Sequence, residues 1–233
     1  VFTQVLLGGD LGGDKVSARY RGVPADSFVV ANLGDGKNSF TLDARANPND
    51  LPGIAPGALD VLVAGGLSTD AVSVSFFHVF GGVQVDVGEG NDGVYIRFDG
   101  LPVGLTAPVN VDMGDGKNVF QILANGNPPP GPPLGARGAV ALALTGGTGS
   151  DVVTMSFFDV FTDLTANLGD GANSASIVLD APVSLANGGA GTVGTNTLFV
   201  WGGVNTDLIY LTLAAAAGAG GATAALGSVA ATL

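Results

Sequence analysis

The sequence predicts an all-β protein, built as a parallel β-solenoid (β-helix) of roughly eight or nine rungs. Three observations carry this prediction. The composition is rich in Gly and poor in charge, a turn motif ending in Asp or Asn recurs along the chain, and apolar residues alternate with polar ones between the turns. These features describe one repeating unit, so we expect residues 1–233 to form a single repeat domain.

The composition limits both the fold and the partners. Apolar residues make up 46% of the chain, charged residues only 12%, and Gly occurs 39 times. Frequent Gly argues against long helices, and the apolar share argues against disorder. The net charge of −12 comes from 19 Asp and a single Glu, which favours tight turns as the place of the acids. With so few basic residues, a nucleic-acid partner is not expected.

Two related turn motifs recur. The first reads Gly-Gly-x-(Gly/Ser/Asn)-x-Asp-x-apolar, and its copies lie at 65–72, 146–153 and 202–209, with a longer version at 8–16. The second reads apolar-Gly-(Asp/Glu)-Gly-x-(Asn/Asp)-x-apolar, and its copies lie at 33–40, 87–94, 113–120 and 168–175. We call the last acid or amide of each turn its marker residue. The markers are Asp14, Asn38, Asp70, Asp92, Asn118, Asp151, Asn173 and Asp207.

The spacing of the markers predicts the rung. Successive markers are 22 to 34 residues apart, and the three long intervals contain segments rich in Gly, Pro or Asn, at 44–57, 125–138 and 181–195. We expect these three segments to be loops. Without them the repeat is about 22 to 26 residues, the length of one rung of a parallel β-helix.

Between the turns, apolar residues recur at every second position and in the same register from copy to copy. After the first motif, Val16, Val72, Val153 and Ile209 occupy equivalent places. Before the second motif, the equivalent residues are Val29, Val83, Val109 and Leu164. A period of two is typical of strands with one buried face. The polar residues that interrupt the second set, Asn32, Asp86, Asp112 and Asn167, are then expected on the other face.

An antiparallel β-sandwich is the alternative fold. Asp-Gly is a strong hairpin signal, and each copy of the second motif could be a hairpin turn. The near-constant rung length favours the solenoid. Within its rungs, the similar segments 75–80 (SFFHVF) and 156–161 (SFFDVF) predict a corner at which Phe side chains fill the core.

The two ends of the chain are expected to cap the solenoid or to link subunits. They comprise a first strand at 2–7 and an uncharged tail at 212–233. The tail consists largely of Ala, Gly and Thr, so no membrane span is expected there.

One turn carries a resemblance to a known family. Residues 146–154 (GGTGSDVVT) fit the nonapeptide GG-x-G-x-D-x-apolar-x at every defined position, and 88–94 (GEGNDGV) fit its common variant. These turns resemble the RTX, or haemolysin-type, calcium-binding repeat. The longer rungs resemble the parallel β-helices of adhesins and autotransporter passengers. The resemblance implies calcium held by Asp side chains and backbone carbonyls. Carried over by position, the implied ligands are Asp151 and Asp92, followed by Asp14, Asp70 and Asp207.

A second column of acids accompanies the markers. It consists of Asp35, Glu89, Asp115 and Asp170, and it adds oxygen ligands of the kind that calcium prefers. Asp and Asn also both favour Asx-turns, so an alternating Asp/Asn ladder could satisfy itself through hydrogen bonds alone. Both hypotheses stay open on the sequence.

No catalytic constellation stands out, and we expect the protein not to be an enzyme. The single His78 is replaced by Asp159 in the matching copy, which favours a structural role. The expected function is that of an extracellular or cell-surface structural protein, a self-associating subunit of a surface layer, matrix or fibre. The alternatives are a calcium-dependent adhesion module and a polysaccharide-active β-helix enzyme. The expected partners are other copies of the chain and, as a second possibility, a surface polysaccharide.

Overall fold

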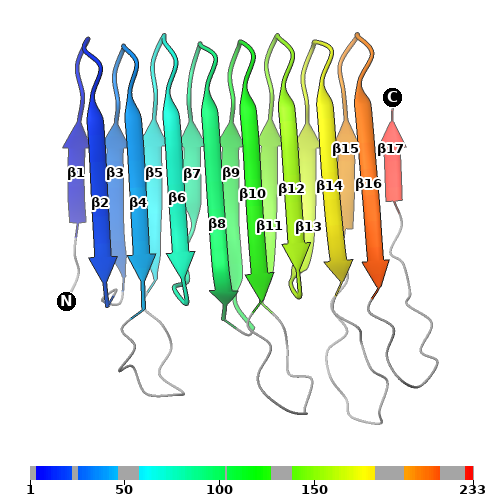
Figure 1. The fold of residues 1–233 in the computed structure, drawn as a ribbon, viewed down its shortest axis with the longest axis horizontal. Helices are drawn as coiled ribbons and strands as arrows, with labels where there is room; N and C mark the ends of the chain where they lie inside the picture. Colours follow the sequence, from blue (N-terminus) through cyan, green and yellow to red (C-terminus); the bar gives the residue numbers. More distant parts are fainter. Residues whose placement is uncertain are drawn as a thin grey trace.

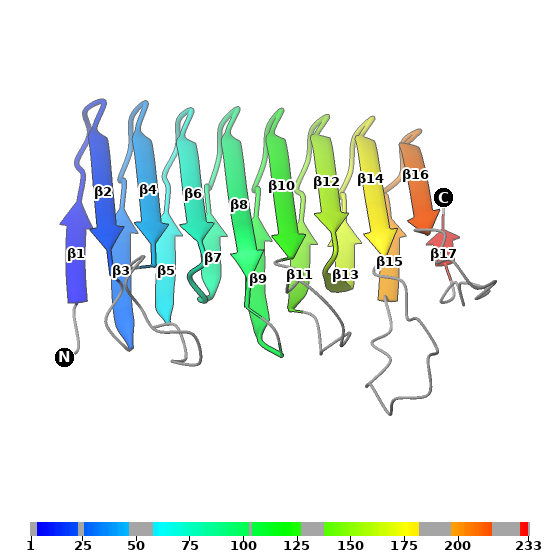
Figure 2. The same cartoon turned by 60° about the horizontal axis from the view of Figure 1, so that its bottom comes forward.

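The computed structural model describes residues 4–22, 26–46, 58–102, 104–126, 138–181, 197–215 and 229–232. These residues form 17 β-strands and no helix, which confirms the all-β prediction. Accordingly, the described part of the chain holds no helix that could cross a membrane. Figures 1 and 2 show the strands in two layers, with the chain passing from one layer to the other after every strand.

Odd-numbered and even-numbered strands form separate sheets, each in chain order. Sheet A contains β1 (Gln4–Gly8), β3 (Ser27–Asn32), β5 (Leu59–Ala64), β7 (Val83–Asp86), β9 (Thr106–Asp112), β11 (Ala139–Thr145), β13 (Phe161–Asn167), β15 (Thr197–Trp201) and β17 (Val229–Thr232). Sheet B contains β2 (Lys15–Arg21), β4 (Ser39–Arg45), β6 (Ala71–Phe77), β8 (Gly93–Leu101), β10 (Val119–Gly126), β12 (Val152–Phe158), β14 (Ser174–Ala181) and β16 (Leu208–Ala215).

Each strand pairs in parallel with the strand two places further along the chain, in sheet A as in sheet B. This arrangement agrees with the solenoid prediction, and it shows that the alternative, an antiparallel sandwich, is wrong. The Asp-Gly turns that suggested hairpins connect a strand of sheet A to a strand of sheet B. The two strands that flank such a turn therefore do not pair with each other.

The core lies between the two sheets and is built from stacked rows of apolar side chains. In sheet A, Val29, Val61, Val83 and Val109 are in register and buried. In sheet B, the corresponding row contains Phe40, Val72, Val94, Phe120 and Val153. The predicted alignment of apolar positions is thus confirmed. Burying each such side chain contributes roughly 1.5–3 kcal/mol, so the stacked rows supply most of the stability.

The two edges of the molecule differ. The connections from sheet A to sheet B line one edge, at the top of Figure 1, and those from sheet B to sheet A line the other. The predicted loops began too early, because residues 44–45 complete β4, 125–126 complete β10 and Ala181 completes β14. Ala44 is buried, so its strand continues into the predicted loop. Most of the remaining residues of 44–57, 125–138 and 181–195 lie outside the described residues.

The two predicted terminal segments belong partly to the sheets. The first strand begins at Gln4, and Phe2 and Thr3 lie outside the described residues. Of the segment 212–233, residues 212–215 extend β16, and 229–232 form β17 at the edge of sheet A.

The aromatic corners are confirmed. Phe76 and Phe157 are buried, and the Phe76 ring stacks on Phe98 with 5.2 Å between ring centroids. In each corner the chain turns sharply one residue after the strand. His78 and Asp159 there have φ values of 54° and 55°, in the left-handed region that Asn, Asp and His enter more readily than most residues.

Candidate functional site

All eight motif copies lie along one edge of the molecule, which we call the turn edge. It comprises the connections 9–14, 33–38, 65–70, 87–92, 113–118, 146–151, 168–173 and 202–207, each leading from sheet A to sheet B. Both motif types take this place, and each marker is the last residue before a strand of sheet B. Because equivalent turns stack, the markers come to lie next to one another.

One hydrogen bond is repeated from marker to marker. The backbone N–H of each marker from Asp14 to Asn173 donates to the Oδ1 atom of the marker in the next turn, with N···O distances of 2.6 to 3.1 Å. We call this series the marker ladder. Its members, in order, are Asp14, Asn38, Asp70, Asp92, Asn118, Asp151, Asn173 and Asp207. All markers from Asn38 to Asn173 are buried.

The second polar atom of each marker matches the type of its turn. In the second motif the turn presents carbonyl groups, and the marker is usually Asn. Asn38 Nδ2 donates to the carbonyls of Gly34 and Gly36, at 3.1 and 2.9 Å. Asn118 and Asn173 donate to carbonyls of their own turns in the same way.

In the first motif the marker is Asp, and in two of its copies the turn presents an N–H group to it instead. Gly66 N–H donates to Asp70 Oδ2 at 3.2 Å, and Asp10 N–H donates to Asp14 Oδ2 at 2.9 Å. A carboxylate oxygen accepts where an amide nitrogen would repel the donor. The choice between Asp and Asn therefore follows from local hydrogen bonding.

Asp92 departs from this rule, since its turn is of the second type. Asp92 Oδ2 is buried without a hydrogen-bond partner. Asp151 belongs to a turn of the first motif, yet its Oδ2 is also buried without a partner. Burial raises the pKa of Asp92 to about 6, the hydrogen bond from Asp70 N–H lowers it, and the nearby Asp70 carboxylate adds to the rise. Burial also raises the pKa of Asp70 and of Asp151. The ladder thus holds carboxyl groups that are costly to ionise.

The second acidic column also forms hydrogen bonds between turns. Oδ1 of Asp35, Asp115 and Asp170 accepts a backbone N–H from the following turn, donated by Leu67, Thr148 and Val204. The Thr148 hydroxyl also donates to Asp115, and both bonds from Thr148 lower the pKa of that carboxyl.

Glu89 is different, because the turn after it is again of the second type. There Asn91 Oδ1 accepts the N–H of Lys117 at 2.9 Å, while Glu89 is exposed and its own N–H donates to Gly66.

The nine candidate calcium ligands are spread along two columns of the turn edge. Among the described residues, no group of three or more His, Cys, Asp or Glu side chains is placed to hold a metal ion. The calcium sites therefore stay a prediction from the resemblance. The hydrogen-bonded Asp/Asn ladder, which was the other hypothesis, is present in the structure.

A second set of Asp and Asn residues accepts backbone N–H groups at the start of the turns, a role that was not predicted from the sequence. Asn32, Asp86, Asp112 and Asn167 each accept the N–H of the glycine two residues ahead, at 3.0 to 3.1 Å. Their sequence spacing, an Asx residue two positions before the first Gly of the motif, is the Asx-turn signature. Alternation alone had marked them only as outward polar residues.

His78 lies away from this edge. It sits at the corner after β6, exposed, with its imidazole ring against Gly100, where a Cβ atom would collide with the ring. Asp159 takes the equivalent position after β12. The repeated corner explains the histidine as a turn residue.

The protein is thus a parallel, two-sheet β protein of the solenoid kind. Along one edge, Asp and Asn side chains form hydrogen bonds between neighbouring turns. Comparison with known proteins found no matching family model, no similar curated protein and no similar solved structure.

Proposed function

We propose that this chain is an extracellular structural protein, a solenoid of eight to nine rungs that self-associates as a subunit of a surface layer, matrix or fibre. The marker ladder carries this proposal. The most regular polar residues of the sequence all take part in bonds between neighbouring turns, and they do not converge on a cavity. These hydrogen bonds stabilise the stacking of each rung on the next.

The strand pairing that joins neighbouring rungs also favours association between chains. A rung is added to its neighbour through a parallel strand pairing that is nearly identical at every step. β2 is the edge strand of sheet B and offers such a pairing to another chain. Strand edges with free backbone N–H and C=O groups are templates for intermolecular pairing.

The free groups of β2 can be identified. Ser39 N–H donates to Asp14 O, and Gly22 N–H donates to Arg45 O, so the even-numbered positions of this stretch face β4. In a parallel ladder the intervening residues point the other way. The N–H groups of Lys15, Ser17, Arg19 and Arg21 are therefore directed to the open edge.

Ser17→Pro tests the proposal, because Pro removes an edge N–H and leaves the pairing with β4 in place. Ser17→Thr keeps the N–H and is the matched control. We expect the wild type and Ser17→Thr to form larger species as concentration rises in analytical ultracentrifugation, and Ser17→Pro to associate at least tenfold more weakly. Unchanged association of Ser17→Pro would remove β2 as the contact. A wild-type chain that stays monomeric at millimolar concentration would overturn the proposal.

A further inference from the structure

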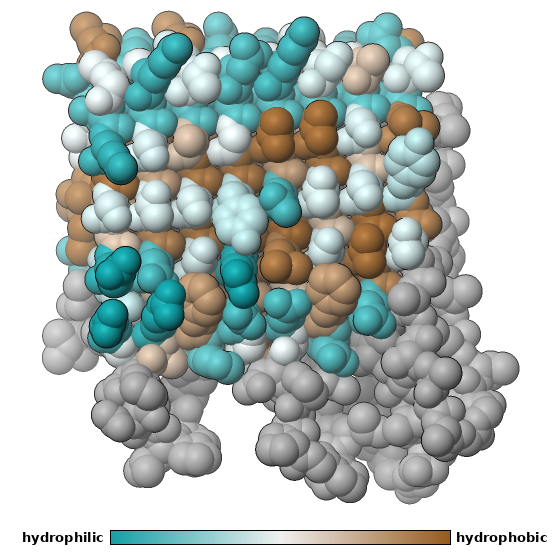
Figure 3. All heavy atoms as spheres, in the orientation of Figure 1, coloured by the Kyte–Doolittle hydropathy of each residue, from teal (hydrophilic) through white to brown (hydrophobic). Residues whose placement is uncertain are grey.

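The outward face of sheet B has an unusual distribution of charge. Five of the eight Lys and Arg residues of the chain lie on it, against three acids, although the net charge of the chain is −12. The cations are Lys15, Arg19, Arg21, Arg45 and Arg97. Figure 3 shows this face, with strongly hydrophilic side chains gathered at its lower left.

Three of these arginines form a cluster with two carboxylates. Arg19 and Arg45 both approach Asp43, at 3.6 and 3.0 Å, and Arg97 pairs with Asp99 at 2.9 Å. The positive charge is thus only partly compensated. Arg97 Nε is buried without a hydrogen-bond partner.

An aromatic ring lies between two of the guanidinium groups. The Arg45 guanidinium stands 4.4 Å from the centroid of the Phe77 ring, and that of Arg97 stands 5.3 Å from it. Contacts of this kind hold the guanidinium planes in place. The cluster therefore presents ordered donors to an anion.

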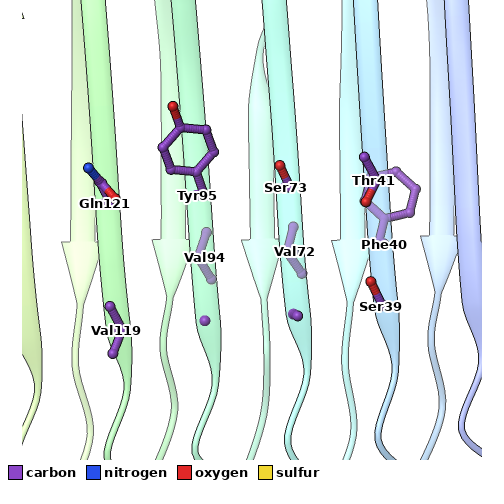
Figure 4. A pocket seen from close by; sticks show the side chains of 11 residues that line it. Ser39, Phe40, Thr41, Val72, Ser73, Val94, Tyr95, Val119 and Gln121 are labelled. Atoms are coloured by element: carbon purple, nitrogen blue, oxygen red, sulfur yellow. The ribbon is translucent and has the colours of Figure 1, made fainter.

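Beside the cluster lies a shallow hollow of about 280 Å³ on the same face. Tyr95 stands over it, and its outward lining is uncharged (Figure 4). Ser39, Thr41, Ser73 and Gln121 contribute polar groups to this lining, and Ala71 and Val119 contribute apolar ones. Its floor is open at Gly93, where an added Cβ would meet no atom within 4 Å.

The polar groups of this hollow belong to a row that crosses the strands. Ser17, Thr41, Ser73, Tyr95, Gln121, Thr154 and Ser176 are in register from β2 to β14. Hydroxyl and amide groups thus repeat at the strand spacing of ~4.8 Å. Such a row suits a ligand that is itself a linear repeat of hydroxyl groups.

We propose that this face, from the Arg45–Phe77–Arg97 cluster to the Tyr95 hollow, binds a linear polysaccharide that carries carboxylates, such as a chain of uronic acids. In this proposal the sugar hydroxyls form hydrogen bonds with the polar row, and the face of a sugar ring packs on Tyr95. The carboxylates pair with the arginines. An extended polyphosphate has neither hydroxyl groups for the polar row nor a ring face for Tyr95. A protein partner would call for larger apolar anchors in the hollow than Tyr95 and Val119.

The test uses the full chain with polygalacturonate oligomers as the probe, at protein concentrations where the chain sediments as a monomer. Binding is measured by calorimetry at low and at moderate salt. Methyl-esterified polygalacturonate keeps the sugar and removes the charge, whereas polyglutamate keeps the charge and removes the sugar. We expect both to bind at least tenfold more weakly than polygalacturonate.

Two pairs of variants locate the site. Gly93→Leu fills the hollow, and Gly8→Leu makes the same change on sheet A, where an added Cβ also meets nothing. Arg45→Gln with Arg97→Gln removes two charges from the face, and Lys117→Gln removes an exposed charge from the turn edge. We expect at least a tenfold loss for Gly93→Leu and for the arginine pair, and no loss for either control.

Several outcomes would overturn the inference. They are no binding of polygalacturonate at millimolar concentration, equal binding of polyglutamate, or losses that are the same for Lys117→Gln as for the arginine pair. If Gly93→Leu has a lower melting temperature than the wild type, the binding of the double variant Arg45→Gln with Arg97→Gln decides whether the inference holds. Because the binding is measured on the unassociated chain, the result is independent of self-association.

Discussion

At the scale of single residues, the choice between Asn and Asp at a marker follows the partner of its second polar atom where that atom has one. Asn38 donates to carbonyls, whereas Asp70 accepts an N–H from Gly66. The ladder bond through Oδ1 is common to both residue types, so Asp and Asn can alternate in it. Asp92 places an acid in a turn of the second motif and leaves a buried oxygen without a partner, as Asp151 does in a turn of the first motif.

Replacing Asp92 with Asn should stabilise the protein at neutral pH. The amide keeps the ladder acceptor, provides a donor toward the turn and removes a buried charge. We expect the free energy of unfolding at pH 7 to rise by about 1–3 kcal/mol, measured by chemical denaturation. A loss of stability would show that the Asp92 carboxylate has a partner after all.

The same substitution should change the dependence of stability on pH. The pKa of Asp92 is about 6 in the folded chain, above its usual value of 3.8. Folding therefore favours the protonated form, and the contribution of Asp92 falls as pH rises from about 4 through 6. The advantage of Asp92→Asn should appear over that range and level off above it. A constant advantage from pH 4 to 8 would contradict this account.

The converse change, Asn118→Asp, should destabilise the protein. Asn118 Nδ2 now donates to the carbonyl of Met113 at 2.9 Å, and a carboxylate oxygen would face that carbonyl instead. It would also place four acids in succession along the ladder, from Asp70 to Asp151. We expect a loss of about 1–3 kcal/mol at pH 7, smaller at pH 4, in the same denaturation assay.

At the scale of elements, the turns stack because glycine lets their backbones touch. Gly116 has a φ of 131°, and a Cβ there would collide with the carbonyl oxygen of Gly90 in the preceding turn. The strands then continue the contact in both sheets. Turn and strand pairing thus support one another, since a turn displaced by a side chain would separate the markers as well.

Gly116→Ala should therefore be strongly destabilising. The left-handed backbone and the contact with Gly90 each resist a Cβ atom, and we expect a loss of more than about 2 kcal/mol. Gly93→Ala is the matched control, because an added Cβ there meets open space, and its effect should stay within about 0.5 kcal/mol. Similar losses for the two variants would show that the stacking of the turns is unimportant.

At the scale of the whole molecule, the rungs form a one-dimensional stack in which neighbouring turns supply each other's hydrogen-bond partners. The ladder provides these partners from within the chain. Stability should consequently not depend on calcium. We expect melting temperatures in millimolar calcium and in excess chelator to agree within about 2 °C, a shift of under about 1 kcal/mol for a chain of this size. A larger rise with calcium would favour the RTX-like sites instead.

The periodic features of this protein could be predicted from its sequence. Alternation placed Val72 and Val153 in one buried row, and the marker spacing placed Asp70 beside Asp92, because repeated segments that fold alike must stack in register. The sequence could not exclude an antiparallel sandwich. An Asp-Gly turn suits a hairpin as well as a connection between two sheets, and the difference lies in which distant strand becomes the neighbour.

The features that differ from rung to rung required the tertiary structure. Asp35 meets Leu67 across 32 residues, and Asp92 lacks the partner that Asn118 finds in its own turn. The Arg45–Phe77–Arg97 cluster likewise joins three strands. Local sequence specifies the turn and the strand, because their periodicity and hydrogen bonding are local. It does not specify which side chain of the next rung arrives opposite, because that depends on stacking over the whole length of the intervening rung.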